Sequence, residues 1–186
     1  KCMSRMYRLL RTAIICIVVI IIASLTSLAS DQSIQGDRDG DRLVSDDELA
    51  RAYQDQKNGT VSSDEILQIE LIHDKYPIEI VDSAGNTVMI YKPLKRVVVL
   101  NGLATEVMQI LNATDVIIGV TVDLENEPLI SPELKSLPSV GRVVEPDLEA
   151  ILHLNPDAVI HYASTMWRTD EIQKKLQKAD PGLIVI

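Results

Sequence analysis

Oxygen-bearing side chains recur early in the chain at the spacing of a cation-binding loop. They fill positions 1, 3, 5, 9 and 12 of a twelve-residue segment: Asp37, Asp39, Asp41, Ser45 and Glu48. Leu43 would add its main-chain carbonyl at position 7. A hard cation such as calcium takes about six to eight oxygen ligands, and this spacing can wrap them around one point. The sequence therefore predicts a calcium site within residues 37–48.

This segment resembles an EF-hand or dockerin-type calcium loop, with one departure. Arg42 stands at position 6, where the pattern has glycine. The positive φ of that position is harder for arginine, and the positive charge weakens the affinity for a cation. The alternative is an acidic linker that ends in an ordinary helix start, because Ser45 and Glu48 also form a capping box on their own.

Two short helices are expected beside this loop. The first covers residues 46–54. A second loop-like stretch has glutamines where carboxylates would be needed, so we interpret it as a structural partner in which Ser62 begins a helix that runs to about His73. The two helices should pack through a shared set of apolar positions: Leu49, Ala52, Ile66, Ile69 and Ile72. Residues 31–75 are therefore expected to form a small, EF-hand-like helical segment.

The rest of the chain alternates short apolar runs with segments of helical period. A β-hairpin is expected over residues 78–90, around a Gly/Asn turn. Four later runs have the length and β-branching of buried strands: residues 97–100, 116–120, 158–161 and 183–186. One apolar helix face is indicated by the spacing of Leu103, Val107, Ile110 and Leu111, and another helix is expected from Pro146. This order predicts an α/β fold, a parallel sheet with crossover helices, whose ligands bind in loops at the carboxyl ends of the strands.

The net charge of the chain is −9, and it is unevenly distributed. Residues 1–29 carry four basic and no acidic residues, which leaves 14 of the 18 basic residues and all 27 acidic residues in the remainder. So acidic a surface repels nucleic acid and anionic lipid, and no nucleic-acid partner is expected.

The basic start is followed by an apolar run over residues 13–25 and by small residues up to Ala29. This order is typical of a secretory signal that is cut after Ala29, and a retained membrane anchor is the alternative. Both cysteines, Cys2 and Cys16, lie in this segment, so no disulfide is expected in the remainder. The protein is therefore expected outside the cytoplasm, secreted or anchored at the cell surface or in the periplasm.

Residues 78–186 resemble the amino-terminal lobe of class III periplasmic substrate-binding proteins, of the iron-siderophore and cobalamin type. The resemblance rests on segments that occur in the family's order: IEIVDSAGNTVMIY, KRVVVL, ILNATDVIIGVT, LPSVGR and EPDLEAILHLNPDAVI. In that family two α/β lobes, joined by one long helix, hold a ligand between them and deliver it to an ABC-type importer. The resemblance implies an iron-chelate (siderophore), haem or cobalamin ligand and an ABC permease as partner.

The same resemblance places ligand-binding residues in the loops of the lobe: Asn101, Gly102, Thr121, Asp123, Arg142, Val143, Tyr162 and Trp167. Aromatic faces such as those of Tyr162 and Trp167 suit flat ligands, although Trp167 could equally pack against its own helix. Glu149 matches the acidic residue at the lobe tip that pairs with arginines of the permease. From the residues alone, Glu149 is a solvated side chain near a helix N-terminus.

No nucleophile elbow, glycine-rich phosphate loop or Cys/His cluster is present, so the chain is not expected to be an enzyme. Two functions remain. The first is the extracytoplasmic solute-binding component of an ABC importer, truncated because the family's linking helix and second lobe do not follow residue 186. The second is a calcium-dependent cell-envelope interaction module that carries a remnant binding lobe.

Overall fold

The computed structural model of the chain describes residues 33–162 and 169–186. The expected signal or anchor in residues 1–29 lies outside the described residues, and so does the candidate ligand residue Trp167. Within the described ranges, no helix is both long and apolar enough to cross a membrane.

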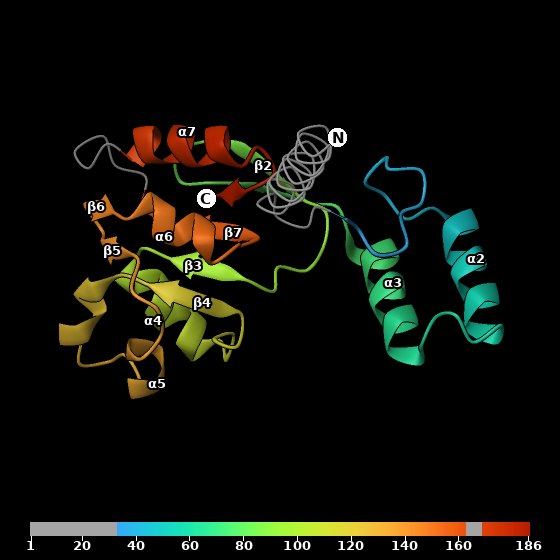
Figure 1. Cartoon of the computed structure of the whole chain (residues 1–186), viewed down its shortest axis with the longest axis horizontal. Coiled ribbons are helices and arrows are strands. Elements are labelled where there is room, and N and C mark those ends of the chain that lie inside the picture. The colour runs from blue at the N-terminus through green and yellow to red at the C-terminus, as the bar shows by residue number, and fades with distance from the viewer. Residues whose placement is uncertain (1–32, 163–168) are drawn as a thin grey trace, which may run out of the picture.

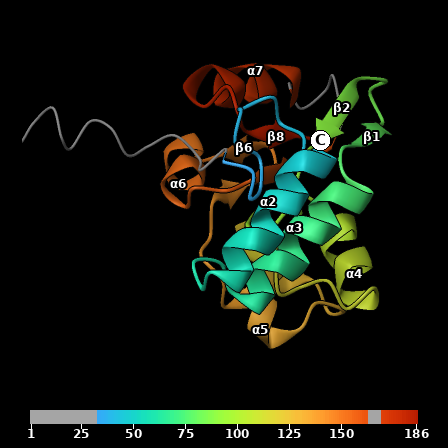
Figure 2. The same cartoon turned by 90° about the vertical axis from the view of Figure 1, so that its right-hand side faces the viewer.

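Two helices, α2 (Asp46–Lys57) and α3 (Ser63–Lys75), follow the acidic loop and lie side by side (Figures 1 and 2). Each begins in a capping box, in which a serine hydroxyl accepts a backbone N–H from the glutamate three residues later and that glutamate accepts the serine N–H. The two helices and the loop share one apolar cluster of buried side chains: Ile34, Val44, Ala52, Ile66, Ile69 and Ile72. The expected packing is confirmed, with Leu49 partly buried at the edge of the cluster.

A β-hairpin connects this segment to the rest of the chain. Strands β1 (Ile78–Val81) and β2 (Thr87–Ile90) pair antiparallel, as predicted. Asp82 closes the turn, because its Oδ1 atom accepts hydrogen bonds from the backbone N–H groups of Ala84 (2.9 Å) and Asn86 (2.8 Å). Gly85 takes the positive φ of +86° that the turn requires.

The four remaining long runs form one parallel sheet. Its strands are β3 (Val97–Val99), β4 (Ile117–Val120), β7 (Ala158–Ile160) and β8 (Ile184–Val185), in the spatial order β4-β3-β7-β8. Each neighbouring pair is parallel. The predicted fold class is therefore confirmed, and each strand is one or two residues shorter than the apolar run that predicted it.

Helices cover both faces of this sheet (Figure 1). Val97 and Val99 face α4 (Gly102–Ile110) and α5 (Pro132–Lys135), in a cluster that includes Ala104 and Met108. Val98 faces α6 (Leu148–His153) and α7 (Thr169–Ala179) on the opposite side. Both faces of β3 are buried, which explains why this strand is apolar at every position and does not alternate.

The apolar face of α4 does not pack as its amphipathic pattern suggests. Its four members, 52–81% exposed, all point away from the core: Leu103, Val107, Ile110 and Leu111. The helix instead contacts the sheet through Ala104, Thr105 and Met108. Thr105 is tolerated there because its hydroxyl donates to the carbonyl of Asn101 at 3.0 Å, so no buried polar group is left unpaired.

The prediction of a helix from Pro146 is also wrong at its start. Pro146 belongs to the short strand β6 (Glu145–Pro146), which pairs with β5 (Gly141–Arg142). Helix α6 begins after Asp147, whose Oδ1 accepts the N–H of Ala150 at 3.0 Å. The carboxylate at the N-cap accepts a hydrogen bond from an N–H group that has no partner within the helix. A proline in the first turn would only remove one such N–H group.

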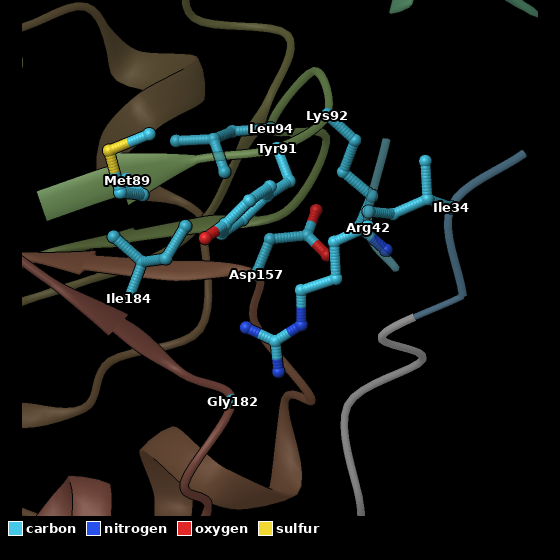
Figure 3. Close-up of a pocket in the computed structure, with 9 residues that line it drawn as sticks. All are labelled: Ile34, Arg42, Met89, Tyr91, Lys92, Leu94, Asp157, Gly182 and Ile184. Atoms are coloured by element: carbon cyan, nitrogen blue, oxygen red, sulfur yellow. The ribbon is translucent and has the colours of Figure 1, made fainter. Parts of the chain in front are cut away.

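The acidic loop contacts the hairpin and the sheet at one junction (Figure 3). The guanidinium of Arg42 lies 5.4 Å from the ring centroid of Tyr91, which follows β2. A small cavity of about 70 Å³ opens beside this pair, and Asp157 and Gly182 from the amino-terminal end of the sheet also line it. The loop thus touches the α/β lobe through a cation–π contact.

Candidate functional site

The order of the strands creates a switch point beside β3. From β3 the chain crosses to β4 on one side, and it later returns to β7 on the other side. The loops that leave these three strands therefore diverge at the carboxyl edge of the sheet, where open α/β sheets bind ligands. A cavity of about 210 Å³ lies there, and its lining includes Leu100 after β3, Thr121 after β4 and Tyr162 after β7.

The cavity combines apolar surfaces with acidic groups. Its apolar lining comes from Leu100, Leu103, Leu124, Val143 and the ring-bearing Tyr162. Its polar lining comes from Glu106, Thr121, Asp123 and Glu127, and Gly102 completes the set. A Cβ atom at Gly102 would stand 3.4 Å from Leu124 Cδ2, which is an ordinary van der Waals contact.

Asp123 organises one wall of this cavity. It lies in the 3-10 helix η1 (Val122–Asn126), and its Oδ2 atom accepts the N–H of Val143 at 2.7 Å. Its Oδ1 atom lies 3.5 Å from Nε of Arg142, whose side chain is largely exposed. One carboxylate thus holds the β5–β6 turn against the loop after β4 and neutralises the arginine of that turn.

Asn101 has a structural role at the start of α4. Its Oδ1 atom accepts the N–H of Ala104 at 3.2 Å, which makes it the N-cap of the helix. Its backbone carbonyl accepts hydrogen bonds from the N–H and the hydroxyl of Thr105, both at 3.0 Å. Asn101 does not line the cavity, and its capping role fixes the turn that brings Gly102 to the cavity.

The structure brings together five of the eight residues expected to bind ligand. Gly102, Thr121, Asp123, Val143 and Tyr162 line the cavity. Of the other three, Arg142 forms an ion pair with the lining residue Asp123, Asn101 caps α4, and Trp167 is outside the described residues. Glu149 is exposed in the first turn of α6, away from this cavity.

Two acidic members of the lining were missed by sequence reasoning. Glu106 lies one turn into α4, four residues after Gly102, and Glu127 follows η1. Neither carboxylate forms a hydrogen bond or ion pair with another described residue. The helical repeat could have identified Glu106, because a residue four positions after a lining residue shares its helix face.

The acidic loop brings three of its predicted ligands together. Carboxylate oxygens of Asp37, Asp39 and Glu48 lie within 4.8 Å of one another. Asp41 instead accepts the N–H of Leu43 at 2.8 Å, and the hydroxyl of Ser45 donates to Glu48 at 2.9 Å. Three carboxylates at this separation match the oxygen chemistry of a hard cation.

Glu48 is already held by hydrogen bonds from the loop. Its carboxylate accepts the backbone N–H groups of Ser45 (2.9 Å), Arg38 (2.6 Å) and Asp39 (3.4 Å), besides the Ser45 hydroxyl. These donors, that of the Ser45 backbone first, lower the pKa of Glu48 to about 2. The side chain is 5% exposed, so a cation would have to replace or share hydrogen bonds that are already made.

Arg42 adopts the backbone conformation that the loop pattern reserves for glycine. Its φ is +71°, and its N–H donates to Oδ2 of Asp37 at 3.0 Å. The N–H of Gly40 donates to the other oxygen of the same carboxylate at 2.7 Å. The loop therefore closes around Asp37 despite the departure at position 6.

No protein-family profile matches the chain. A search of curated proteins also finds no match.

Among solved structures, the chain is similar to the petrobactin-binding protein YclQ from Bacillus subtilis, at 24% identity and a TM-score of 0.46 over 60% of this chain and 38% of that one. It is similar to the haem-binding protein HmuT at 24% identity and a TM-score of 0.44, over 60% of this chain and 34% of that one. It is also similar to the periplasmic vitamin B12 binding protein BtuF of Vibrio cholerae, at 24% identity and a TM-score of 0.40 over 50% and 34% of the two chains. The chain spans about a third of the length of these proteins. All three are described as binding proteins.

Proposed function

We propose that this chain provides a solute-binding lobe of an ABC importer that works outside the cytoplasm. The observation that carries the proposal is the cavity at the switch point beside β3, which is lined by residues from the loops that follow three strands. Its apolar floor and its few polar groups are the combination that small-molecule sites use. The proposed ligand is an iron chelate, haem or a cobalamin-type compound.

The size of the cavity indicates how it would be used. Its volume of about 210 Å³ is below the roughly 300–1,000 Å³ of ordinary small-molecule pockets. A corrin or a ferric siderophore would therefore be only partly enclosed by the described residues. In this proposal the cavity is one wall of a cleft, and a second surface completes the enclosure.

Two further observations support the proposal. The sequence resemblance over residues 78–186 points to the same class of proteins, and the similar solved structures are described as binding haem, petrobactin or vitamin B12. Glu149 is exposed in the first turn of α6, where an arginine of a permease could reach it. We assign Glu149 to permease docking on that basis.

Ligand titration tests the proposal with a matched pair of variants. Haemin, cobinamide and ferric siderophores are added to the purified chain while the fluorescence of its single tryptophan is recorded. Leu103 and Ile110 are both exposed apolar residues of α4, but only Leu103 lines the cavity. Leu103→Ala should weaken binding about fivefold, the equivalent of ~1 kcal/mol of apolar contact, and Ile110→Ala should leave it unchanged. Absence of quenching by every ligand, or equal weakening by both variants, would contradict the proposal.

A second candidate function rests on the acidic loop. We propose that Asp37, Asp39 and Glu48 bind calcium, with oxygen atoms of Asp41, Leu43 and Ser45 completing the shell after rearrangement, and that the ion stabilises an envelope-interaction segment. The proximity of the three carboxylates favours this candidate. Calorimetry with calcium should give heat for the parent chain and for Asp64→Ala, which removes an acidic residue at the start of α3, and none for Asp37→Ala. The same absence of heat from all three proteins would reduce the segment to an acidic linker.

A further inference from the structure

We propose that the cavity beside β3 selects a ligand that presents a positively charged group, and that it discriminates against polyanionic chelates. This inference rests on the proposed solute-binding function, because it concerns the ligand of the same cavity. The proposed function allows any iron chelate, haem or corrinoid as ligand. This inference predicts the highest affinity for cationic chelates and the next highest for neutral corrinoids.

The first argument is the balance of charge around the cavity. Three carboxylates line it, those of Glu106, Asp123 and Glu127, and no lysine, arginine or histidine does so among the described residues. Arg142, a described cation beside the cavity, is paired with Asp123, so that pair is close to neutral. The carboxylates of Glu106 and Glu127 have no compensating partner in the described part of the chain. The part of the wall formed by the described residues therefore carries close to two negative charges.

The second argument is an unused hydrogen-bonding group at the same place. Thr121 is only 2% exposed and lines the cavity, yet its hydroxyl makes no hydrogen bond with another described residue. The hydroxyl oxygen is not fully buried, so it is accessible to a ligand group that enters the cavity. A hydroxyl oxygen can accept a hydrogen bond from an ammonium group, as the neighbouring carboxylates can.

These groups would act more strongly once a ligand fills the cavity. An apolar lining lowers the local dielectric constant, so the attraction between a carboxylate and a cation is larger there than in water. The same field repels the propionates of haem and the threefold negative charge of a ferric tris-catecholate. The cavity is thus favourable for a cationic hydroxamate chelate and unfavourable for anionic ligands.

A pair of ligands that differ only in charge tests the inference. Ferrioxamine B carries one ammonium group and a net charge of +1, whereas its N-acetyl form is neutral with the same iron-binding groups. The chain should bind ferrioxamine B about tenfold more tightly than the acetylated form at low salt, and the ratio should fall as the salt concentration rises. Tryptophan quenching and calorimetry both report the two dissociation constants.

Three matched glutamine variants assign the effect to the cavity. Glu106→Gln should weaken ferrioxamine B binding about fivefold, and Glu127→Gln, which is more exposed, about twofold. Each variant should weaken the binding of ferrioxamine B more than that of the acetylated chelate, so the ratio of the two dissociation constants should fall. Glu79→Gln on β1 removes the same charge far from the cavity, so it should change neither affinity.

The outcomes separate this inference from the function on which it rests. Equal or tighter binding of the acetylated form, or of a ferric tris-catecholate, would overturn the charge preference while the solute-binding function stands. An equal effect of Glu79→Gln and Glu106→Gln would also overturn it, because the preference would then come from the net charge of the whole protein. If no chelate of any charge binds, the proposed function fails and this inference fails with it.

Discussion

Removing the charge of Glu48 should destabilise the α2–α3 segment in a pH-dependent manner. Glu48→Gln keeps the size of the side chain but replaces one carboxylate oxygen with an NH₂ group. If this NH₂ group faces the N–H of Ser45, two hydrogen-bond donors meet and no hydrogen bond forms. The negative charge that strengthens the hydrogen bonds from the N–H groups of Arg38 and Asp39 is lost as well. The loop before α2 should therefore lose its central anchor.

The magnitude follows from the pKa of this group. The pKa of Glu48 falls from 4.5 to about 2 in the folded chain, chiefly through the Ser45 and Arg38 amides. At about 1.4 kcal/mol per pH unit, the fall from 4.5 to about 2 corresponds to at most ~3.5 kcal/mol. Screening by solvent around the loop reduces this to about 1–2 kcal/mol. Because the folded pKa is depressed, this stability is present above pH 4.5 and is lost as the pH falls towards 2.

Urea denaturation at a series of pH values, followed by far-ultraviolet circular dichroism in the presence of a calcium chelator, measures the effect. At pH 7 the parent chain should exceed Glu48→Gln by about 1–2 kcal/mol, and the two should converge near pH 2. Glu65→Gln is the matched control, because Glu65 fills the same place in the second capping box but accepts hydrogen bonds only from Ser62. Its effect should be smaller. A constant difference between parent and Glu48→Gln from pH 7 to pH 2 would refute the reasoning.

Two other perturbations have definite expected results. Gly141→Ala should destabilise the lobe by about 2–3 kcal/mol in urea denaturation, because a Cβ atom there would stand 2.8 Å from the Asp147 nitrogen at a φ of +85°. Gly40→Ala, at a φ of +81° with nothing within 4 Å, should cost only the backbone strain of about 1 kcal/mol, and equal losses would contradict this explanation. Hydrogen bonds from His73 to Asp74 and to Asp46 raise the pKa of His73 above 6.5, so its stabilising effect is full below pH 6.5 and is lost as the pH rises through the raised value. An NMR titration should give a midpoint above 6.5 that falls in Asp46→Asn, and an unchanged midpoint would show that the α2 contact is unimportant.

The parallel sheet was predictable because its signal is local and strong. Val97 to Val99 are apolar and β-branched at every position, which favours a short strand buried on both faces. Helix α4 shows the limit of this reasoning. Its apolar spacing correctly indicates a helix, but periodicity does not specify which face meets the sheet. A hydroxyl that bonds back to Asn101 let Thr105 enter the core in place of the leucine-rich face.

The candidate ligand cavity was predictable only in part. The sheet order follows from the fold class, and it brings the ends of β3, β4 and β7 together with Thr121 and Tyr162. The three-dimensional path of η1 determines that Asp123 pairs with Arg142. It also determines that Glu127 lines the cavity. Such paths depend on tertiary contacts between segments about 20 residues apart, which a local pattern does not encode.

A substitution at Arg42 would change two properties of the acidic loop, its affinity for a cation and its contact with the hairpin, in opposite directions. A glycine at this position would relieve the strain of a φ of +71° by about 1 kcal/mol and would remove a positive charge from beside the carboxylates. It would also abolish the stacking on Tyr91, worth about 0.5–1 kcal/mol at an exposed site. Replacing Arg42 with glycine would therefore raise the affinity of the loop for a cation and weaken its contact with the neighbouring hairpin. Glycine at this position would therefore favour cation binding by the loop, whereas Arg42 favours the contact between the loop and Tyr91.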